Sequence, residues 1–151
     1  MQQLPNKWDL RLLELAKLVS TWSKDTSSQM GACITTSDRR ILSVGYNGMC
    51  RHVSDDVPER HERPLKYKWF EHAERNAIYN AAASGVSISG CTMHCMCTPC
   101  CDCARAIIQS GLSRVVWYEP SESIKSRWAE DLEIAKGMLT EAGVFFVEVP
   151  T

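Results

Sequence analysis

The chain has 151 residues, of which 44% are hydrophobic and 23% charged, and its formal net charge is −1. These values are ordinary for a soluble globular protein, and the length fits a single domain over residues 1–151. Binding of a nucleic acid polymer usually requires a basic face, which this composition disfavours, whereas a single nucleotide needs only one or two cations.

No apolar run is long enough to span a membrane, and residues 1–9 lack the charged-then-apolar pattern of a signal peptide. We therefore expect a cytoplasmic protein with no membrane partner. Cysteines in that compartment are expected to be thiols or metal ligands rather than disulfides. Six of the eight cysteines fall between Cys91 and Cys103, and this clustering requires an explanation.

The first half of the chain begins with apolar residues at helical spacing, which predict a helix over residues 8–22. Two short β-prone runs, 31–35 and 41–44, are joined by a polar turn and predict a hairpin. Gly45-Tyr46-Asn47-Gly48 ends the second strand. Residues 49–70 are charged, contain two prolines and show no period, so we predict one long loop there, of the kind that is usually functional or disordered.

The second half of the chain alternates helices and strands, with glycines at the expected helix ends. The predicted elements are a helix over 71–83, a strand over 91–98, a helix from about 99 to 109, a strand over 114–118, a helix over 125–142 and a strand over 144–149. The resulting order of elements predicts a layered α/β domain with a mixed sheet.

A candidate metal site lies at two predicted helix starts. Cys100 and Cys103 form a Cys-x-x-Cys pair preceded by Pro99, and two thiolates at that spacing can reach one ion. His72-Ala73-Glu74 opens the earlier helix, so His72 is the best candidate for a third ligand. Glu74 would then lie beside the metal without binding it. H-x-E followed by P-C-x-x-C is the signature of zinc-dependent base deaminases.

The same cysteines and histidines could also form other kinds of site. Cys95 and Cys97 would be near enough to complete a structural four-cysteine site, but His72 and Glu74 would then be unexplained. A redox pair is disfavoured because the proline precedes the first cysteine. A second, structural ion would need histidines from the group His52, His61 and His94.

These motifs resemble those of the deoxycytidylate (dCMP) deaminases in the cytidine-deaminase superfamily. The similarity runs from about Leu10 to Val149 and includes residues 23–32, 45–49, 54–56, 72–78 and 99–111. It implies a three-layer cytidine-deaminase-like α/β fold, in which helices flank a mixed five-stranded sheet. It also implies hydrolysis of dCMP to dUMP and ammonia, which supplies dUMP for thymidylate synthesis, with Zn2+ at the catalytic site.

The resemblance also implies residue roles. Glu74 would be catalytic, and His72, Cys100 and Cys103 would bind zinc. Asn47 and Ala73 would contact the substrate, with Lys24 and Tyr118 near its phosphate. An effector site would be built from Gly45, Tyr46, Asn47, Gly48, Asp55 and Asp56.

The family is commonly a hexamer that dCTP activates and dTTP inhibits with Mg2+, so we expect a homo-oligomer with these effectors. The chain departs from the usual pattern at Cys50, where a proline is common, and at Asn80 and Ala83 on the helix bordering the effector site.

Two classes of alternative function remain open at this point. One is another zinc deaminase, acting on tRNA adenosine, free nucleosides or dCTP. Recognition of tRNA would call for a basic face. The other is a zinc module that binds or scaffolds without catalysis, and four protein ligands on the ion would indicate it.

Overall fold

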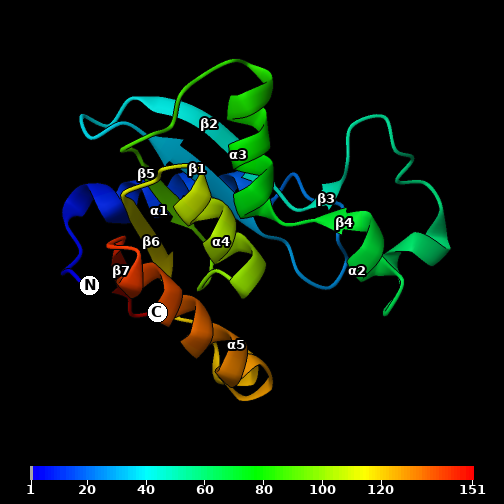
Figure 1. The fold of residues 1–151 in the computed structure, drawn as a ribbon. Coiled ribbons are helices and arrows are strands. Elements are labelled where there is room, and N and C mark those ends of the chain that lie inside the picture. The colour runs from blue at the N-terminus through cyan, green and yellow to red at the C-terminus, as the bar shows by residue number, and fades with distance from the viewer. Residues whose placement is uncertain (1) are drawn as a thin grey trace.

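The computed structural model describes residues 2–151, and a five-stranded sheet runs through its centre (Figure 1). In spatial order its strands are β2 (Ile41–Tyr46), β1 (Gly31–Thr35), β5 (Thr92–Cys95), β6 (Arg114–Tyr118) and β7 (Phe145–Val149). β1 is antiparallel to both β2 and β5, whereas β5, β6 and β7 are parallel. The predicted mixed five-stranded sheet is therefore confirmed.

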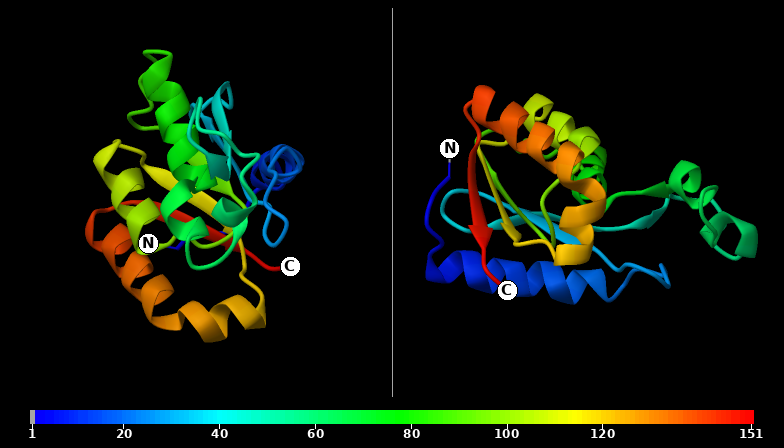
Figure 2. Two further views of the ribbon diagram at one scale, coloured as in Figure 1. Left: turned by 90° about the vertical axis from the view of Figure 1, so that its right-hand side faces the viewer. Right: turned by 90° about the horizontal axis from the view of Figure 1, so that it is seen from below.

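Helices cover both faces of this sheet, which gives three layers (Figure 2). α1 (Lys7–Ser20) lies on one face, and α3 (Ala73–Ala83), α4 (Cys101–Gln109) and α5 (Glu122–Glu141) lie on the other. Buried side chains fill both interfaces, among them Trp117 and Met93 on the side of α3 and Leu13 on the side of α1. No helix within residues 2–151 is long and apolar enough to cross a membrane.

Two glycines allow helices to lie directly on the sheet. A Cβ atom at Gly31 would come within 2.1 Å of the backbone oxygen of Ala16 in α1. A Cβ atom at Gly45 would come within 2.3 Å of the backbone nitrogen of Ala77 in α3. Real Cβ contacts are never this short, so these positions require glycine. The second contact holds α3, which carries the candidate catalytic residue, at a fixed distance from β2.

The region predicted as one long loop contains short elements. β3 (Gly48–Met49) pairs with β4 (Phe70–Glu71), and between them lie a 3-10 helix η1 (Pro58–His61) and α2 (Lys66–Trp69). The segment projects from the main body on the right of Figure 1. Elements of two to four residues are too short to produce a recognisable period, which is why the sequence did not predict them.

Most of the predicted boundaries lie within two residues of the observed ones, and two differ by three. β5 ends at Cys95 rather than at residue 98, so the chain from residue 96 to the start of α4 has no regular structure. α5 begins at Glu122 because Ser121 caps it, with the Ser121 side chain accepting a hydrogen bond from the backbone N–H of Ile124. Both changes place additional residues near the sheet edge at which α3 and α4 start.

Candidate functional site

The starts of α3 and α4 bring the three predicted metal ligands together. His72 is the residue before α3, Cys100 is the residue before α4, and Cys103 lies in the first turn of α4. His72 Nδ1 lies 3.5 Å from the Sγ atoms of both Cys100 and Cys103. The three ligand atoms all lie within 4.8 Å of one another.

This donor set fits zinc. A tetrahedral zinc ion, with bonds of about 2.0 Å to nitrogen and 2.3 Å to sulfur, separates these two ligands by about 3.6 Å. The observed separation between His72 Nδ1 and either sulfur is 3.5 Å. Three protein ligands are the usual number for a catalytic zinc site, which keeps a fourth position for water or substrate.

Cys100 has the properties of a metal-binding thiolate. The hydrogen bond from Cys103 is the main cause that lowers the pKa of Cys100 to about 4, and His72 adds to the effect. Its position at a helix start also favours negative charge. Cys100 is therefore ready to bind a cation at neutral pH.

Glu74 is the second residue of α3 and lies beside these ligands without joining them. Its side chain is buried, and Cys103 Sγ donates to Glu74 Oε2 at 3.5 Å. Burial raises the pKa of the Glu74 carboxyl, and the opposing effect of His72 is smaller. A carboxyl group whose pKa is raised toward neutrality can both accept and donate a proton, as acid–base catalysis requires.

Arg75 compensates part of the negative charge around this group. It pairs with Glu71 at 2.5 Å and with Asp102 at 3.4 Å. Burial lowers the pKa of Arg75, but the negative charge of Cys103 and the pairing with Glu71 outweigh it, so the pKa is raised. The sequence did not predict this role, because Glu71 lies in β4 before α3 whereas Asp102 lies in α4, and only the fold brings both to Arg75.

The alternatives to this metal site receive no support from the described residues. Cys95 Sγ donates to the backbone oxygen of Cys97, and neither residue joins the ligand group. His94 pairs with Asp9 on the α1 side of the sheet, and His61 contacts the backbone oxygen of Asp55. Within residues 2–151, no second cluster of three metal-binding side chains is found.

A cavity of about 450 Å3 opens beside His72 and Glu74. Of the predicted substrate residues, Asn47 and Ala73 line it. Its other lining residues include Asp25, Ser27 and Ser28 before β1, Arg63 and Lys66 in the projecting segment, Thr98 before α4, and Arg127 and Trp128 in α5. The cavity is large enough for a nucleotide-sized ligand.

Lys24 and Tyr118, which were expected near the substrate phosphate, do not line this cavity. Lys24 Nζ pairs with Asp55 at 2.9 Å on the other side of Asn47. Tyr118 packs against the apolar cluster on the α1 side of the sheet and its hydroxyl donates to Glu14 at 3.1 Å. The alternation of side chains along β6 explains why Tyr118 faces α1 as Val116 does.

A second cavity, of about 480 Å3, contains most of the predicted effector residues. Tyr46, Asn47, Gly48 and Asp55 line it, together with Lys24, Arg51, His61, Phe70, Tyr79 and Asn80. Gly45 lies beneath α3 and Asp56 is exposed, and neither lines this cavity. Asn47 and Phe70 line both cavities, so the two share a wall.

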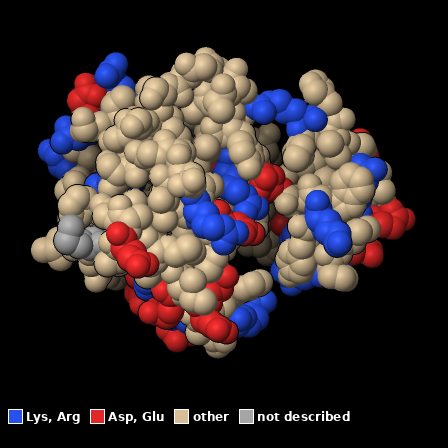
Figure 3. Space-filling model, in the orientation of Figure 1, with Lys and Arg blue, Asp and Glu red and all other residues tan. Residues whose placement is uncertain are grey.

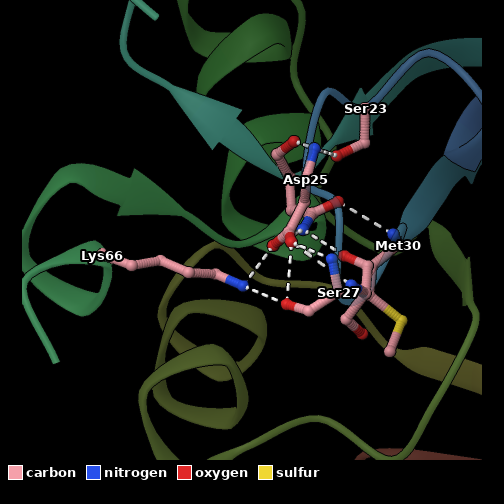
Figure 4. A network of polar contacts seen from close by, with 7 residues as sticks. Ser23, Asp25, Ser27, Met30 and Lys66 are labelled. Carbon is pink, nitrogen blue, oxygen red and sulfur yellow. Dashed lines mark hydrogen bonds and ion pairs between the residues drawn. The ribbon is translucent and has the colours of Figure 1, made fainter. Parts of the chain in front are cut away.

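Sequence reasoning missed a polar network at the first cavity. Asp25, Ser27 and Lys66 contact one another there (Figure 4). Lys66 belongs to the segment without a period, and its partners are distant in sequence, so no local pattern could have identified it. On the face shown in Figure 3, acidic and basic side chains are interspersed, and no continuous basic surface is visible.

Comparison with known proteins agrees with this site. The sequence model of the cytidine and deoxycytidylate deaminase zinc-binding region matches residues 6–119. An uncharacterized deaminase of Aliivibrio fischeri is 41% identical over 145 residues, covering 96% of this chain and 95% of the relative. Human deoxycytidylate deaminase is 37% identical over 145 residues, covering 93% of this chain and 78% of the human protein.

The fold has a counterpart among solved structures. The crystal structure of dCMP deaminase from the cyanophage S-TIM5, in complex with dCMP and dUMP, superposes with a TM-score of 0.76. The two sequences are 23% identical, and the match covers 97% of this chain and 100% of the cyanophage chain. At this identity the similarity establishes the fold. The match of residues 6–119 and the identity to the relatives establish more: the chain belongs to the cytidine and deoxycytidylate deaminase family.

Proposed function

We propose that this protein catalyses the zinc-dependent hydrolysis of dCMP to dUMP and ammonia, and thereby supplies dUMP for thymidylate synthesis. The observation that carries the proposal is the group of His72, Cys100 and Cys103 with Glu74 beside it in one cavity. The choice of dCMP is supported by the name of the human relative and by the cyanophage enzyme, which was solved with dCMP and dUMP.

In this proposal His72, Cys100 and Cys103 hold the zinc ion. When bound, zinc lowers the pKa of water to about 7, which makes hydroxide available at neutral pH. Asn47 and Ala73, which line the cavity, belong to the substrate site. The three proposed zinc ligands and Glu74 all lie at the starts of α3 and α4.

Glu74 moves the protons. Its carboxylate accepts a proton from the attacking water and delivers it to ring nitrogen N3, while the oxygen adds to C4. Glu74 then takes the remaining proton from the hydroxyl on C4 and gives it to the exocyclic amine, so that ammonia leaves as the C4 carbonyl forms. One water is consumed and one ammonia is released, so the reaction balances. Burial raises the pKa of the Glu74 carboxyl, which makes it a better acceptor for the proton that it takes from water.

The test is ammonia release measured with dCMP, CMP, dCTP and deoxycytidine, each with and without a zinc chelator. We expect dCMP to be the best substrate and the chelator to abolish its turnover, with recovery on addition of zinc. A preference for dCTP or deoxycytidine would overturn the assignment of substrate. No turnover of any of the four by zinc-loaded protein would favour a zinc module without catalysis.

We further propose that the second cavity binds a triphosphate effector with Mg2+, through which dCTP activates the enzyme and dTTP inhibits it. We also propose that the protein acts as a homo-oligomer, expected to be a hexamer. This cavity is lined by Tyr46, Asn47, Gly48 and Asp55. Gly45 and Asp56 do not line it, so in this proposal they would affect effector binding only indirectly. Asp55 is paired with Lys24, so a magnesium ion would compete with that lysine for the carboxylate. The wall shared with the first cavity supports an effect of one site on the other.

A further inference from the structure

Asp25 and Lys66 form an ion pair that is buried although the partners are far apart in sequence. Lys66 Nζ lies 2.6 Å from Asp25 Oδ2, and the two side chains are only 8% and 4% exposed. Lys66 Nζ also donates to Ser27 Oγ at 2.7 Å. Figure 4 shows the lysine reaching from α2 toward the segment that precedes β1.

Stability alone gives a weak reason for such a pair. Removing two charges from water costs several kcal/mol each, and apolar residues of similar size often replace a buried pair at no cost in stability. Burial raises the pKa of Asp25, but the hydrogen bonds from Lys66 and Ser27 outweigh it and the pKa is lowered. The Asp25 carboxyl is thus charged at neutral pH, and the role of the pair is to be sought in what it holds in place.

Asp25 organises the chain that follows it. Its Oδ1 atom accepts hydrogen bonds from the backbone N–H of Ser27 at 2.8 Å and of Ser28 at 3.2 Å, and from the Ser27 hydroxyl at 3.0 Å. Its Oδ2 atom accepts from Lys66 and from Asn47 Nδ2 at 3.2 Å. The carboxylate therefore fixes a tight turn over residues 25–28.

The same contacts fix the orientation of Asn47. Its Nδ2 group donates to Asp25 and to the backbone oxygen of Ser28 at 2.8 Å, and its Oδ1 atom accepts from the backbone N–H of Met30 at 2.8 Å. Both N–H bonds of the amide are used. Asn47 is thus held in one rotamer by groups that themselves depend on Asp25.

All of these residues face one cavity. Asp25, Ser27, Ser28, Asn47 and Lys66 line the space that also contains His72 and Glu74. The turn after Asp25, together with Asn47, makes one wall of that space. Lys66 attaches the projecting segment between β3 and β4 to this wall, and the Lys24–Asp55 pair lies next to it.

We propose that the Asp25–Lys66 pair is a positioning device that preforms the substrate-binding wall of the cavity. The inference rests on the proposed function, because it takes the cavity beside His72 as the substrate site. Asp25 and Lys66 are positioning residues, since they act through Asn47 and the 25–28 turn and not on the reacting atoms. Loss of the pair is expected to weaken substrate binding while the metal group stays intact.

The experiment compares Lys66→Met, Lys66→Arg and Asp25→Asn in the full-length, zinc-loaded protein. Lys68→Met is the matched control, because Lys68 lies on the same short helix and is exposed. We expect Lys66→Met to raise KM for dCMP about 10- to 100-fold and to change kcat less than about threefold. Zinc content should stay at the wild-type value, Lys66→Arg should recover most of the loss, and Lys68→Met should match the wild type.

A double variant and a measurement without substrate complete the test. Asp25→Asn combined with Lys66→Met should cost less than the sum of the single changes, because each single change leaves one buried charge without its partner and the double change leaves none. Hydrogen exchange at the amides of residues 27–30 should accelerate in Lys66→Met and stay unchanged in Lys68→Met.

Unchanged exchange, an unchanged KM, or a fall in kcat that arginine does not rescue would each overturn the inference. If wild type and Lys68→Met also fail to deaminate dCMP, the proposed function fails, and the exchange data still decide whether the pair holds this wall.

Discussion

Glu74 lies next to the proposed metal ligands, but its proposed role is proton transfer and not metal binding. It lies two residues after the proposed metal ligand His72, yet its carboxylate contacts Cys103 and is not part of the ligand group. Glutamine has nearly the same shape but cannot accept and return a proton. A change at this position therefore removes the chemistry with little change in the surroundings.

We expect Glu74→Gln to retain zinc and dCMP binding and to lose about 10²–10⁴-fold in kcat, the usual contribution of an acid–base group. Metal analysis and a binding titration, run beside the activity assay, check this. Glu130→Gln, on the exposed face of α5, is the control. Cys100→Ala should differ by losing zinc together with activity. A loss below about tenfold in Glu74→Gln would mean that another group moves the protons.

At the scale of elements, α1 is tied to the sheet by a buried polar cluster opposite the metal group. Asp9 completes the capping box with Asn6, forms two hydrogen bonds with Arg114 at 2.7 and 2.8 Å, and accepts one from His94 at 3.0 Å. The His94 Nδ1 atom is buried and has no hydrogen-bond partner. A second proton on His94 would therefore find no acceptor.

The pKa values of this cluster predict how stability depends on pH. Burial lowers the pKa of His94, so its contribution is complete above the unfolded value of about 6.5 and is lost as pH falls below it. Burial raises the pKa of Asp9, but hydrogen bonds from Arg114 and His94 outweigh it and lower the pKa. The contribution of Asp9 is thus present above pH 4, approximately, and is lost under more acidic conditions.

We expect His94→Gln to flatten the pH dependence of unfolding between pH 7 and pH 5, because glutamine can still donate to Asp9 but does not titrate. Wild type should lose at most about 1.4 kcal/mol per pH unit from this one group. Urea unfolding at pH 7, 6 and 5, at equal zinc loading, measures the difference between the two proteins. Equal slopes for both would show that His94 does not titrate in this range on unfolding.

The elements that the sequence predicted well are those whose signals are local. The starts of α3 and α4 follow from residue spacing at His72 and Cys100, and the three ligands meet as expected. The short elements between residues 48 and 71 were not predicted, because the β3–β4 pairing joins Gly48–Met49 to Phe70–Glu71, which are distant in sequence.

Long-range contacts explain the remaining differences at the site. The Asp25–Lys66 pair joins two segments that show no common pattern, and no local pattern links Lys24 with its partner Asp55. Charged side chains in loops can face several directions, and the backbone that decides between them is fixed only by packing.

At the scale of the whole molecule, the two cavities are joined by short segments of chain. Lys24 lines the second cavity, whereas its neighbour Asp25 lines the first, and Asn47 lines both. Trp22 and Tyr79 lie at the second cavity with half of their surfaces exposed, and Trp22 contacts Tyr46 edge to face at 6.1 Å. Such exposed aromatic groups suit contacts with another copy of the chain.

An effector alters activity only if it binds two states of the enzyme with different affinities. The proposed effectors differ at the pyrimidine ring, since dTTP has a carbonyl where dCTP has an amine. A cavity that shares Asn47 and Phe70 with the substrate cavity can convert that difference into a change in substrate affinity. Reciprocity requires that dCMP change the affinity for the effector by the same factor.

We therefore expect dCTP to shift the dCMP saturation curve to lower concentration and Mg-dTTP to shift it to higher concentration. Asp55→Asn should weaken both shifts, because Asp55 is the carboxylate that lines the second cavity. Asp38→Asn is the control, because Asp38 is likewise paired with a basic residue, Arg40, and does not line the cavity. If millimolar Mg-dTTP neither binds nor changes the rate, this chain lacks the regulation, and Asn80, which lines the cavity, and Ala83 on the same helix become the first positions to exchange.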